Sequence, residues 1–384
     1  TIMVGPDGSV PSGSGGSVIP FPYDETYLDA SGTPQNIPTT GTRYLLPEMS
    51  VLTGGWYVVR VDVTLPERLT VTGDVHLILM DGCKLDAQEG ITVNESDSLT
   101  IYAQSNDEAQ MGVLTATSSD LNDAGIGGSS GAGGTITING GKITAVGKGG
   151  GYYGSAGIGG GDKGAGGTIT INGGNVTAVG GEHGAGIGGG DGGAGGTIQI
   201  NGGTVTATSS GGMFVGAGIG GGSSGGSNGT FAANGNALII ASSISDNGED
   251  KKASWSGVIF EGDNGRVYGD SFTLTTDAEI PSGKTLEIEA GKTVTIDSGV
   301  TLTNNGAITG TGTLTGSGTL TGSGTIAGTI NNTFLKESMV TVSFEGEGVS
   351  GDTVSYGSSI TIKATVQQKV NALSAQPNTV DFYL

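Results

Sequence analysis

One unit of sequence recurs four times in the middle of the chain, and it limits the fold more than any other feature. The copies read "GGTITINGGKITA" from Gly133, "GGTITINGGNVTA" from Gly166, "GGTIQINGGTVTA" from Gly195 and, in a diverged form, "NGTFAANGNALII" from Asn228. Apolar and polar residues alternate within each copy, with the two-residue period of a β-strand that buries one face. Each copy therefore predicts two short strands joined by an Asn-Gly-Gly turn.

A third short segment, "AGIGG", recurs between the copies and predicts a third strand in each unit. Its isoleucines fall in register at Ile126, Ile158, Ile187 and Ile219. Three strands per unit close one coil, and parallel stacking of similar coils lets each backbone form hydrogen bonds with the coils above and below it. We therefore predict an all-β fold, a right-handed parallel β-helix (β-solenoid), with glycine at its corners.

Alignment of the copies predicts columns of stacked side chains along the solenoid. The core columns contain Ile136, Ile169, Ile198 and Phe231; Ile138, Ile171, Ile200 and Ala233; and Ile143, Val176, Val205 and Leu238. Stacked amides hydrogen-bond along such an axis, which predicts a ladder of Asn139, Asn172, Asn201 and Asn234. In the preceding rungs the core positions are assigned to Ile78, Met80, Leu85, Leu99, Ile101 and Leu114. Asp81 is assigned to the ladder and Cys83 to a corner, without the context of a nucleophile.

Composition and charge exclude several classes of function. The 384 residues include 79 Gly but only 13% charged residues, while the apolar share is 34%. This composition favours a folded glycine-rich repeat protein over a disordered chain. A net charge of −21 disfavours nucleic acid and anionic membranes as partners. No segment is long and apolar enough to insert in a membrane. A single cysteine allows no internal disulfide framework. We expect a monomer.

Downstream of the long rungs the apolar period shortens to six residues. It places Ile296, Leu302, Ile308, Leu314, Leu320 and Ile326 in one series. One short strand and one corner per six residues are typical of a narrower solenoid. The segment between the two rhythms carries Trp255 and follows neither of them. We interpret it as a long loop or a lateral cap, because a solenoid end needs cover.

These patterns predict the domain organisation. The predicted parts are an N-terminal linker and cap at 1–60, a parallel β-helix at 61–335 (long rungs 61–240, loop or cap 241–271, short hexad-like rungs 272–335), and the start of a truncated bacterial Ig-like domain at 336–384. The last part is assigned from clean strand alternation with ordinary turn signals. Trp56, just before the first long rungs, is interpreted as a cap anchor. The chain itself is interpreted as a piece of a longer protein.

Several segments together resemble large surface proteins of gut Firmicutes. The resemblance rests on "GWYVVRVDVTLPERLTVTGDVHLILMDGCKLDAQEGITV", "SLTIYAQ", the "AGIGGG…GGTITINGG" repeats and "WSGVIFEGDNGRVYG", and it covers about residues 25 to 335. Those proteins are similar to pectate-lyase-like β-helices carried by Ig-like or other repeats. The resemblance implies secretion, display on the bacterial cell surface and an adhesin or stalk function. It does not imply an activity, because fold alone does not fix function.

Catalysis by this chain is the alternative hypothesis. A polysaccharide lyase or glycoside hydrolase of pectate-lyase-like fold needs paired carboxylates, or a base beside an acidic calcium cluster. Charged side chains are nearly absent from the outward positions of the regular rungs, so no catalytic residue is assigned. A third hypothesis, ice binding by the outward threonines, is disfavoured because Gln199 and Ala232 interrupt the rank.

Carbohydrate binding is assigned to the variable loops after the second strand of each unit. These loops read "GKGGGYYGSAG", "GGEHGAG" and "SSGGMFVGAG", and aromatic faces with polar rims suit sugar rings. The predicted site consists of Tyr152, Tyr153, His183, Met213 and Phe214. We expect a host or dietary glycan, or a host surface protein, as partner. The alternative is that these loop tips cover the core or contact a neighbouring domain.

One metal site is considered, with no other cofactor. Asp162 and Asp191 occupy equivalent places in "GGGDKG" and "GGGDGG", so they are predicted to lie close together on successive coils. Calcium held with loop carbonyls would relieve their repulsion. The alternative is a pair of solvated loop residues.

Overall fold

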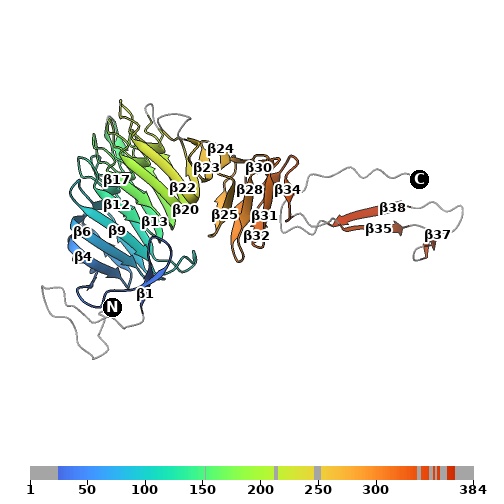
Figure 1. Cartoon of the computed structure of the whole chain (residues 1–384), viewed down its shortest axis with the longest axis horizontal. Coiled ribbons are helices and arrows are strands. Elements are labelled where there is room, and N and C mark those ends of the chain that lie inside the picture. The colour runs from blue at the N-terminus through green and yellow to red at the C-terminus, as the bar shows by residue number, and fades with distance from the viewer. Residues whose placement is uncertain are drawn as a thin grey trace.

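The computed structural model describes residues 25–151, 153–211, 215–245 and 252–334, and strand backbone within 339–367. The main elements of these residues are β-strands, and most of the strands pair in parallel (Figure 1). None of the described residues belongs to a helix with the length and apolar character needed to cross a membrane. The structure is therefore an all-β chain whose long sheet is that of a parallel β-helix.

The first solenoid extends from β4 to β22 and presents three strands per coil (Figure 1). One face contains the last parts of β4 (Val51–Val59) and β6 (Leu69–Leu79), then β9 (Ser98–Ala103), β12 (Thr135–Ile138), β17 (Thr168–Ile171) and the first parts of β20 (Thr197–Ser209) and β22 (Thr230–Ala241). The second contains β5 (Val63–Leu65), β7 (Lys84–Ala87), β10 (Val113–Thr117), β13 (Lys142–Val146), β18 (Asn175–Gly180) and the remainder of β20 and β22. The third contains the first parts of β4 and β6, then β8 (Ile91–Thr92), β11 (Ile126–Gly127), β16 (Ile158–Gly159), β19 (Ile187–Gly188) and β21 (Ile219–Gly220).

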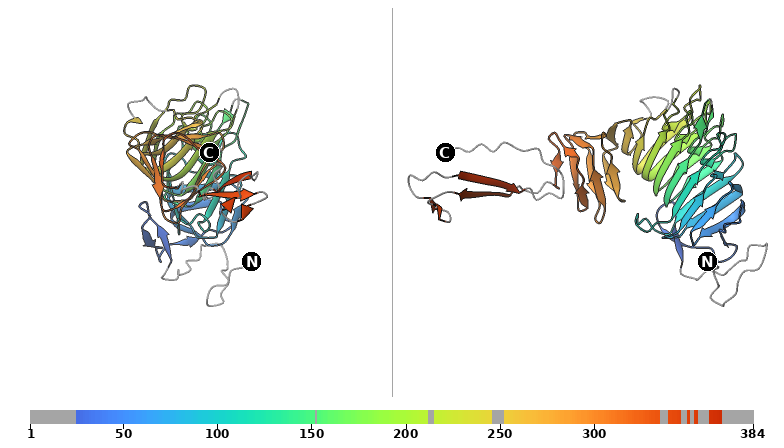
Figure 2. Two further views of the ribbon diagram at one scale, coloured as in Figure 1. Left: turned by 90° about the vertical axis from the view of Figure 1, so that its right-hand side faces the viewer. Right: turned by 180° about the vertical axis from the view of Figure 1, so that it is seen from behind.

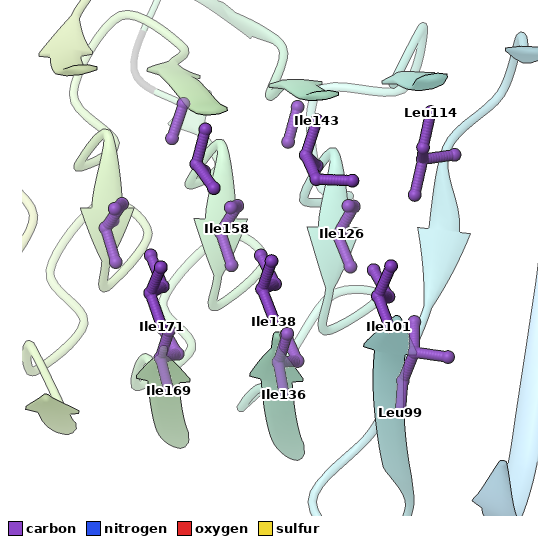
Figure 3. Close-up of a cluster of buried hydrophobic side chains, with 14 of the residues drawn as sticks. Leu99, Ile101, Leu114, Ile126, Ile136, Ile138, Ile143, Ile158, Ile169 and Ile171 are labelled. Atoms are coloured by element: carbon purple, nitrogen blue, oxygen red, sulfur yellow. The ribbon is translucent and has the colours of Figure 1, made fainter. Parts of the chain in front are cut away.

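Within the four repeated copies the predicted core columns form, with one exception. Ile136 pairs with Ile169, Ile138 with Ile171, and Ile126 with Ile158. Their side chains point into one interior (Figure 3) and are fully buried. Burial of each such side chain contributes about 1.5–3 kcal/mol, which offsets the entropy lost when the glycine-rich backbone is ordered.

The exception is Leu238, which the alignment places in the column of Val205. A register shift after Ile200 inserts one residue into β22, so Val205 pairs with Ile239. Leu238 consequently points to the other face of the sheet, where it belongs to a second core. The cause is a local bulge, which moves every following side chain to the opposite face.

The predicted asparagine ladder is confirmed. Nδ2 of Asn172 donates to Oδ1 of Asn139, and Nδ2 of Asn201 donates to Oδ1 of Asn172, both at 2.7 Å. Asn234 continues the ladder more weakly, at 3.4 Å from Oδ1 of Asn201. The corners need glycine because the coils approach closely. At Gly188, where φ is +136°, an added Cβ would lie 1.9 Å from the carbonyl oxygen of Gly220.

The assignment of Ile78 and Met80 to the core column is wrong by one residue. Leu77 pairs with Ile101, so the alternate residues of β6 face the interior. Ile78 and Met80 point outward into a separate apolar cluster that also contains Ile37. Both faces of β6 are covered, so apolar alternation cannot identify the inner face. Asp81 is likewise displaced from the ladder.

An aromatic cluster covers the outer face of the first coils. Trp56 and His76 are paired in adjacent strands, and their rings stack with centroids 4.3 Å apart. Tyr27 from β1 (Thr26–Leu28), which forms an antiparallel hairpin with β2 (Pro34–Asn36), packs on Trp56 and on Tyr102. The cluster therefore attaches the N-terminal hairpin to the solenoid. Burial is the largest of the effects that raise the pKa of Tyr102 to about 12.

A hairpin of β23 (Gly257–Glu261) and β24 (Asn264–Tyr268) joins two solenoids. β23 is parallel to β22 and antiparallel to β24, which is parallel to β27 (Thr285–Ile288). Ile259 faces the first core, whereas Phe260 faces the second. The interior of the second solenoid therefore lies on the opposite side of the shared sheet.

Two reversals at this hairpin determine how the second solenoid winds. Strand direction reverses between β23 and β24, and the interior changes to the other face of the sheet. The second solenoid continues beyond the last coil of the first (Figure 1). Each reversal alone would invert the hand of the coil, and together they preserve it. The two solenoids therefore wind with the same hand, and its right-handed sense remains a prediction.

The second solenoid has the predicted six-residue rhythm. Leu302 pairs with Leu320 and Ile308 with Ile326, so the last coil has 18 residues on three short faces. The coil before it is longer, since Thr285 pairs with Ala307, 22 residues on. Its strands are β25 (Ser271–Leu274), β26 (Ala278–Ile280), β27, β28 (Thr293–Ile296), β29 (Thr301–Asn304), β30 (Ala307–Gly310), β31 (Thr313–Gly316), β32 (Thr319–Thr321), β33 (Thr325–Ile326) and β34 (Asn331–Asn332).

Shorter pairs complete the described elements. β3 (Arg43–Tyr44) pairs with β4, and β14 (Gly149–Gly150) forms a hairpin with β15 (Tyr153–Gly154). Beyond the second solenoid, β35 (Met339–Glu345) is antiparallel to β38 (Thr361–Gln367), and β36 (Val349–Ser350) to β37 (Thr353–Val354). An Ig-like domain at 336–384 stays a prediction.

Candidate functional site

A groove lies where the second solenoid meets the outer face of the first. The second solenoid stands to one side because its interior occupies the outer side of the shared sheet, and Figure 2 shows this offset from behind. Two cavities, of about 490 and 350 Å³, lie in the resulting angle. They adjoin, because consecutive residues line one and then the other: Gly174 and Asn175, Gly203 and Thr204, Thr276 and Asp277. We call the pair the junction groove.

The smaller cavity is the amide section of the junction groove. The turn Ala30–Gly32 of the N-terminal hairpin lines it, as do Thr275 and Thr276 of the second solenoid. Its other lining residues are Asn106, Asn139, Asn172, Gly173, Gly174, Asn201, Gly202, Gly203 and Asn236. None of these described lining residues is charged. The section therefore offers amides and exposed backbone, which are hydrogen-bonding groups without net charge.

Each ladder amide keeps hydrogen-bonding capacity for a ligand. A side-chain amide has two N–H donors and two acceptor lone pairs. Asn172 uses one donor toward Asn139 and one lone pair toward Asn201. The ladder also fixes which end of each amide faces which neighbour. Successive coils therefore repeat a free N–H donor at the spacing of the coils, about 4.8 Å.

The larger cavity is the acidic section. Glu108 from the first solenoid and Asp277 and Glu279 from the second line it. One oxygen of each carboxylate accepts a hydrogen bond from a neighbouring group. The donors are Asn175 Nδ2 to Glu108 at 3.0 Å, the backbone N–H of Thr301 to Asp277 at 2.6 Å, and Asn305 Nδ2 to Glu279 at 2.8 Å. These bonds orient the three carboxylates and leave an oxygen of each toward other partners.

The predicted carbohydrate site is only partly within the described residues. Tyr153 is 45% exposed, and Nζ of Lys163 lies 5.6 Å from its ring centroid. Tyr152, Met213 and Phe214 lie outside the described residues. The pairing of these side chains across successive loops therefore stays a prediction.

His183, which the sequence analysis placed in the same site, is buried. The ring is 5% exposed, with Nε2 3.0 Å from the carbonyl oxygen of Gly151 and Nδ1 2.9 Å from Oγ of Ser223. Because a carbonyl oxygen only accepts, Nε2 donates to Gly151. His183 thus connects loops of three coils, and this placement does not suit direct contact with a sugar.

The two aspartates assigned to calcium are buried at equivalent corners. Both are 7% exposed. Oδ1 of Asp191 accepts a hydrogen bond from Oγ of Ser223 at 3.0 Å, and Oδ2 of Asp162 lies 3.5 Å from Nζ of Lys163. Among the described residues no group of three His, Cys, Asp or Glu side chains could hold a metal ion. Calcium at these aspartates would therefore depend on backbone and water oxygens, and it stays a proposal.

Cys83 lies at the predicted corner. It directly follows the turn at Asp81 and Gly82, and its side chain is partly buried. Burial raises the pKa of its thiol, which disfavours the reactive thiolate.

The sequence analysis did not find the junction groove. Glu108 lies far in the sequence from Asp277 and Glu279, so no local motif joins the three carboxylates. One signal was available: the segment around Trp255 follows neither period, which marks a change in the direction of the chain. The second solenoid lies on the side of β23 that faces the second core, and the sequence does not show which side that is.

Comparisons with known proteins support the fold. A family model described as a beta helix repeat matches residues 136–162, 169–191 and 198–223. The match supports a parallel β-helix in this part of the chain. The matched residues contain the first three copies of the repeated unit, from β12 to the corner after β21. Neither the comparison with curated proteins nor that with solved structures found a match.

Proposed function

We propose that this chain is a secreted β-helical module of a bacterial cell surface, acting as an adhesin or stalk, that binds carbohydrate in the junction groove. The observation that carries the proposal is the amide section. There Asn139, Asn172 and Asn201 each keep a free amide N–H donor along the axis. Asn139 and Asn172 also keep an acceptor lone pair, whereas Oδ1 of Asn201 already accepts from Gln199 and Asn234. Sugar hydroxyls are both donors and acceptors, so an oligosaccharide lying along the ladder satisfies these groups in succession.

The shape of the groove favours a chain over a single sugar. The two adjoining sections extend over several coils and include residues of both solenoids. A linear oligosaccharide presents hydroxyl groups at intervals of the same order as the coil spacing. Host and dietary glycans are the ligands we expect for a surface module of this kind.

Calorimetric titration of the chain with neutral hexasaccharides, such as cellohexaose, xylohexaose and mannohexaose, tests this proposal. Thr275→Trp fills the exposed rim of the amide section and should abolish binding of the best ligand. Thr319→Trp is the matched control, because Thr319 is an exposed threonine of the same solenoid that lines neither section. Equal loss in both variants, or no binding of any hexasaccharide, would contradict the proposal.

Hydrolysis of a glycan is the second candidate function, and one observation favours it. Three carboxylates line a single cavity, and glycosidases use a pair of them. Incubation with the same hexasaccharides, followed by measurement of new reducing ends, tests for activity. Activity that disappears in Glu108→Gln, Asp277→Asn or Glu279→Gln would favour the enzyme over the binding module. Binding without cleavage would favour the module.

A further inference from the structure

We propose that the acidic section of the junction groove binds a protonated amine, so that the groove prefers oligosaccharides of amino sugars with free amino groups. This inference rests on the proposed function, because it concerns the same groove. It names the class of sugar that the acidic section would select.

The charge in the acidic section is unbalanced. Glu108, Asp277 and Glu279 line it, and no described lining residue is Lys, Arg or His. None of the three carboxylates lies within ion-pair distance of a cationic side chain in the described part of the chain. Lys142 precedes Asn175 in the same column of the sheet, is exposed and does not line the cavity. A cation that enters the section would therefore meet three carboxylates that no cationic side chain of the described residues already neutralises.

A buried hydroxyl in the same cavity points independently to a ligand. Thr204 lines the acidic section and is only 8% exposed. Its Oγ1 is buried and has no hydrogen-bond partner among the described residues. An unsatisfied buried polar atom destabilises the structure that contains it. A ligand with a hydroxyl or ammonium group beside Thr204 would remove this destabilisation.

The chemistry of the section favours an amine over a metal ion. The three carboxylates do not form a group that could hold a metal among the described residues. Each carboxylate accepts one hydrogen bond, from Asn175, Thr301 or Asn305. The remaining lone pairs of the three carboxylates therefore lie at separate places in the cavity lining. An ammonium group has three diverging donors, and it suits acceptors that come from different directions.

The amide section provides the remainder of the recognition. It adjoins the acidic section through consecutive residues such as Gly203 and Thr204. A ligand that extends through both must offer hydroxyls to neutral amides and an amine to carboxylates. A chain of glucosamine units has both groups in every unit. Cellohexaose is its matched neutral counterpart, since a hydroxyl replaces each amino group.

The experiment compares three hexasaccharides on the full chain by calorimetric titration: the glucosamine hexamer, its N-acetylated form and cellohexaose. We expect the glucosamine hexamer to bind at least about tenfold more tightly than cellohexaose at low ionic strength. The preference should nearly vanish in about 1 M salt, where the Debye length is about 3 Å. The triple variant Glu108→Gln, Asp277→Asn, Glu279→Gln should bind the glucosamine hexamer and cellohexaose alike.

The control variant is Glu287→Gln, which removes a half-exposed carboxylate of the second solenoid that lines neither section. It should keep the preference for the amine. Equal affinity for all three hexamers overturns this inference but leaves the proposed function in place. A preference for the amine that persists in the triple variant also overturns it, because the net charge of −21 would then be its source. No binding of these three hexamers overturns this inference, and no binding of xylohexaose or mannohexaose either overturns the proposed function as well.

Discussion

Ile259 and Phe260 are neighbours in β23, yet their side chains belong to different hydrophobic cores. Ile259 packs in the first solenoid, and Phe260 packs in the second. A single strand is therefore the wall of two interiors, one on each face. This arrangement offsets the second solenoid and creates the junction groove, so the proposed binding site is a consequence of how the two cores share one sheet.

Truncation of the two neighbours should destabilise different parts of the chain. Phe260→Ala removes a fully buried ring, and such a change costs about 3–5 kcal/mol. Because coils contact only their neighbours, amides of 272–326 should lose protection from hydrogen exchange, while those of 126–207 keep it. Ile259→Ala should show the opposite pattern. Uniform loss of protection in both variants would mean that the two cores unfold as one.

Sequence repetition explains which parts of the fold were predictable. Near-identical copies align without ambiguity, so the columns of Ile136 and Ile138 and the asparagine ladder follow from the alignment alone. The errors lie where the copies diverge or where both faces of a strand are covered. Leu238 is displaced by an inserted residue, and Ile78 belongs to a strand whose outer face is covered by the N-terminal hairpin.

Interruption of the asparagine ladder should cost more at its centre than at its end. Asn172 makes two ladder bonds at 2.7 Å, whereas Asn234 makes one at 3.4 Å. Asn172→Ala should lower the free energy of unfolding by about 1–3 kcal/mol, because it leaves partners on both sides unsatisfied. Asn234→Ala should change it by less than about 0.5 kcal/mol. Urea unfolding measures both, and equal effects would argue against a continuous ladder.

Close stacking at the third face should make one glycine irreplaceable and a nearby one tolerant. An alanine at Gly188 would place its Cβ 1.9 Å from the carbonyl oxygen of Gly220. Gly192 also has a positive φ, +69°, but its added Cβ would meet nothing within 4 Å. Gly192→Ala should therefore cost only about 1–2 kcal/mol of backbone strain. Gly188→Ala should prevent the coils from stacking, and circular dichroism and thermal melting would then separate the two variants clearly.

The candidate site was less predictable than the fold for a physical reason. Sequence repetition determines which side chains stack on one another along the solenoid axis. The junction groove depends instead on the lateral offset of the second solenoid, which β23 and β24 determine. Those strands break both periods, and Glu108 and Asp277 meet in one cavity only after the chain has turned. Burial of His183 was equally hidden, since its partners Gly151 and Ser223 lie in other coils.

Alkaline pH should release the N-terminal hairpin from the aromatic cluster. The pKa of Tyr102 is raised to about 12 from an ordinary value of 10, with burial as the largest cause. The folded state therefore holds the phenolic proton more tightly than the unfolded state does. Its stabilising contribution is complete below pH 10 and is lost as the pH rises from 10 to 12.

The rings around Tyr102 provide the signal for this measurement. Trp56 stacks on Tyr102 at 5.4 Å, so its fluorescence should change as the phenol ionises and Tyr27 separates. Tyr102→Phe lacks the ionising group, and its fluorescence should change less over the same pH range, although it loses the hydrogen bond to Nδ1 of His76. An unchanged transition in Tyr102→Phe would show that another group controls the release of the hairpin.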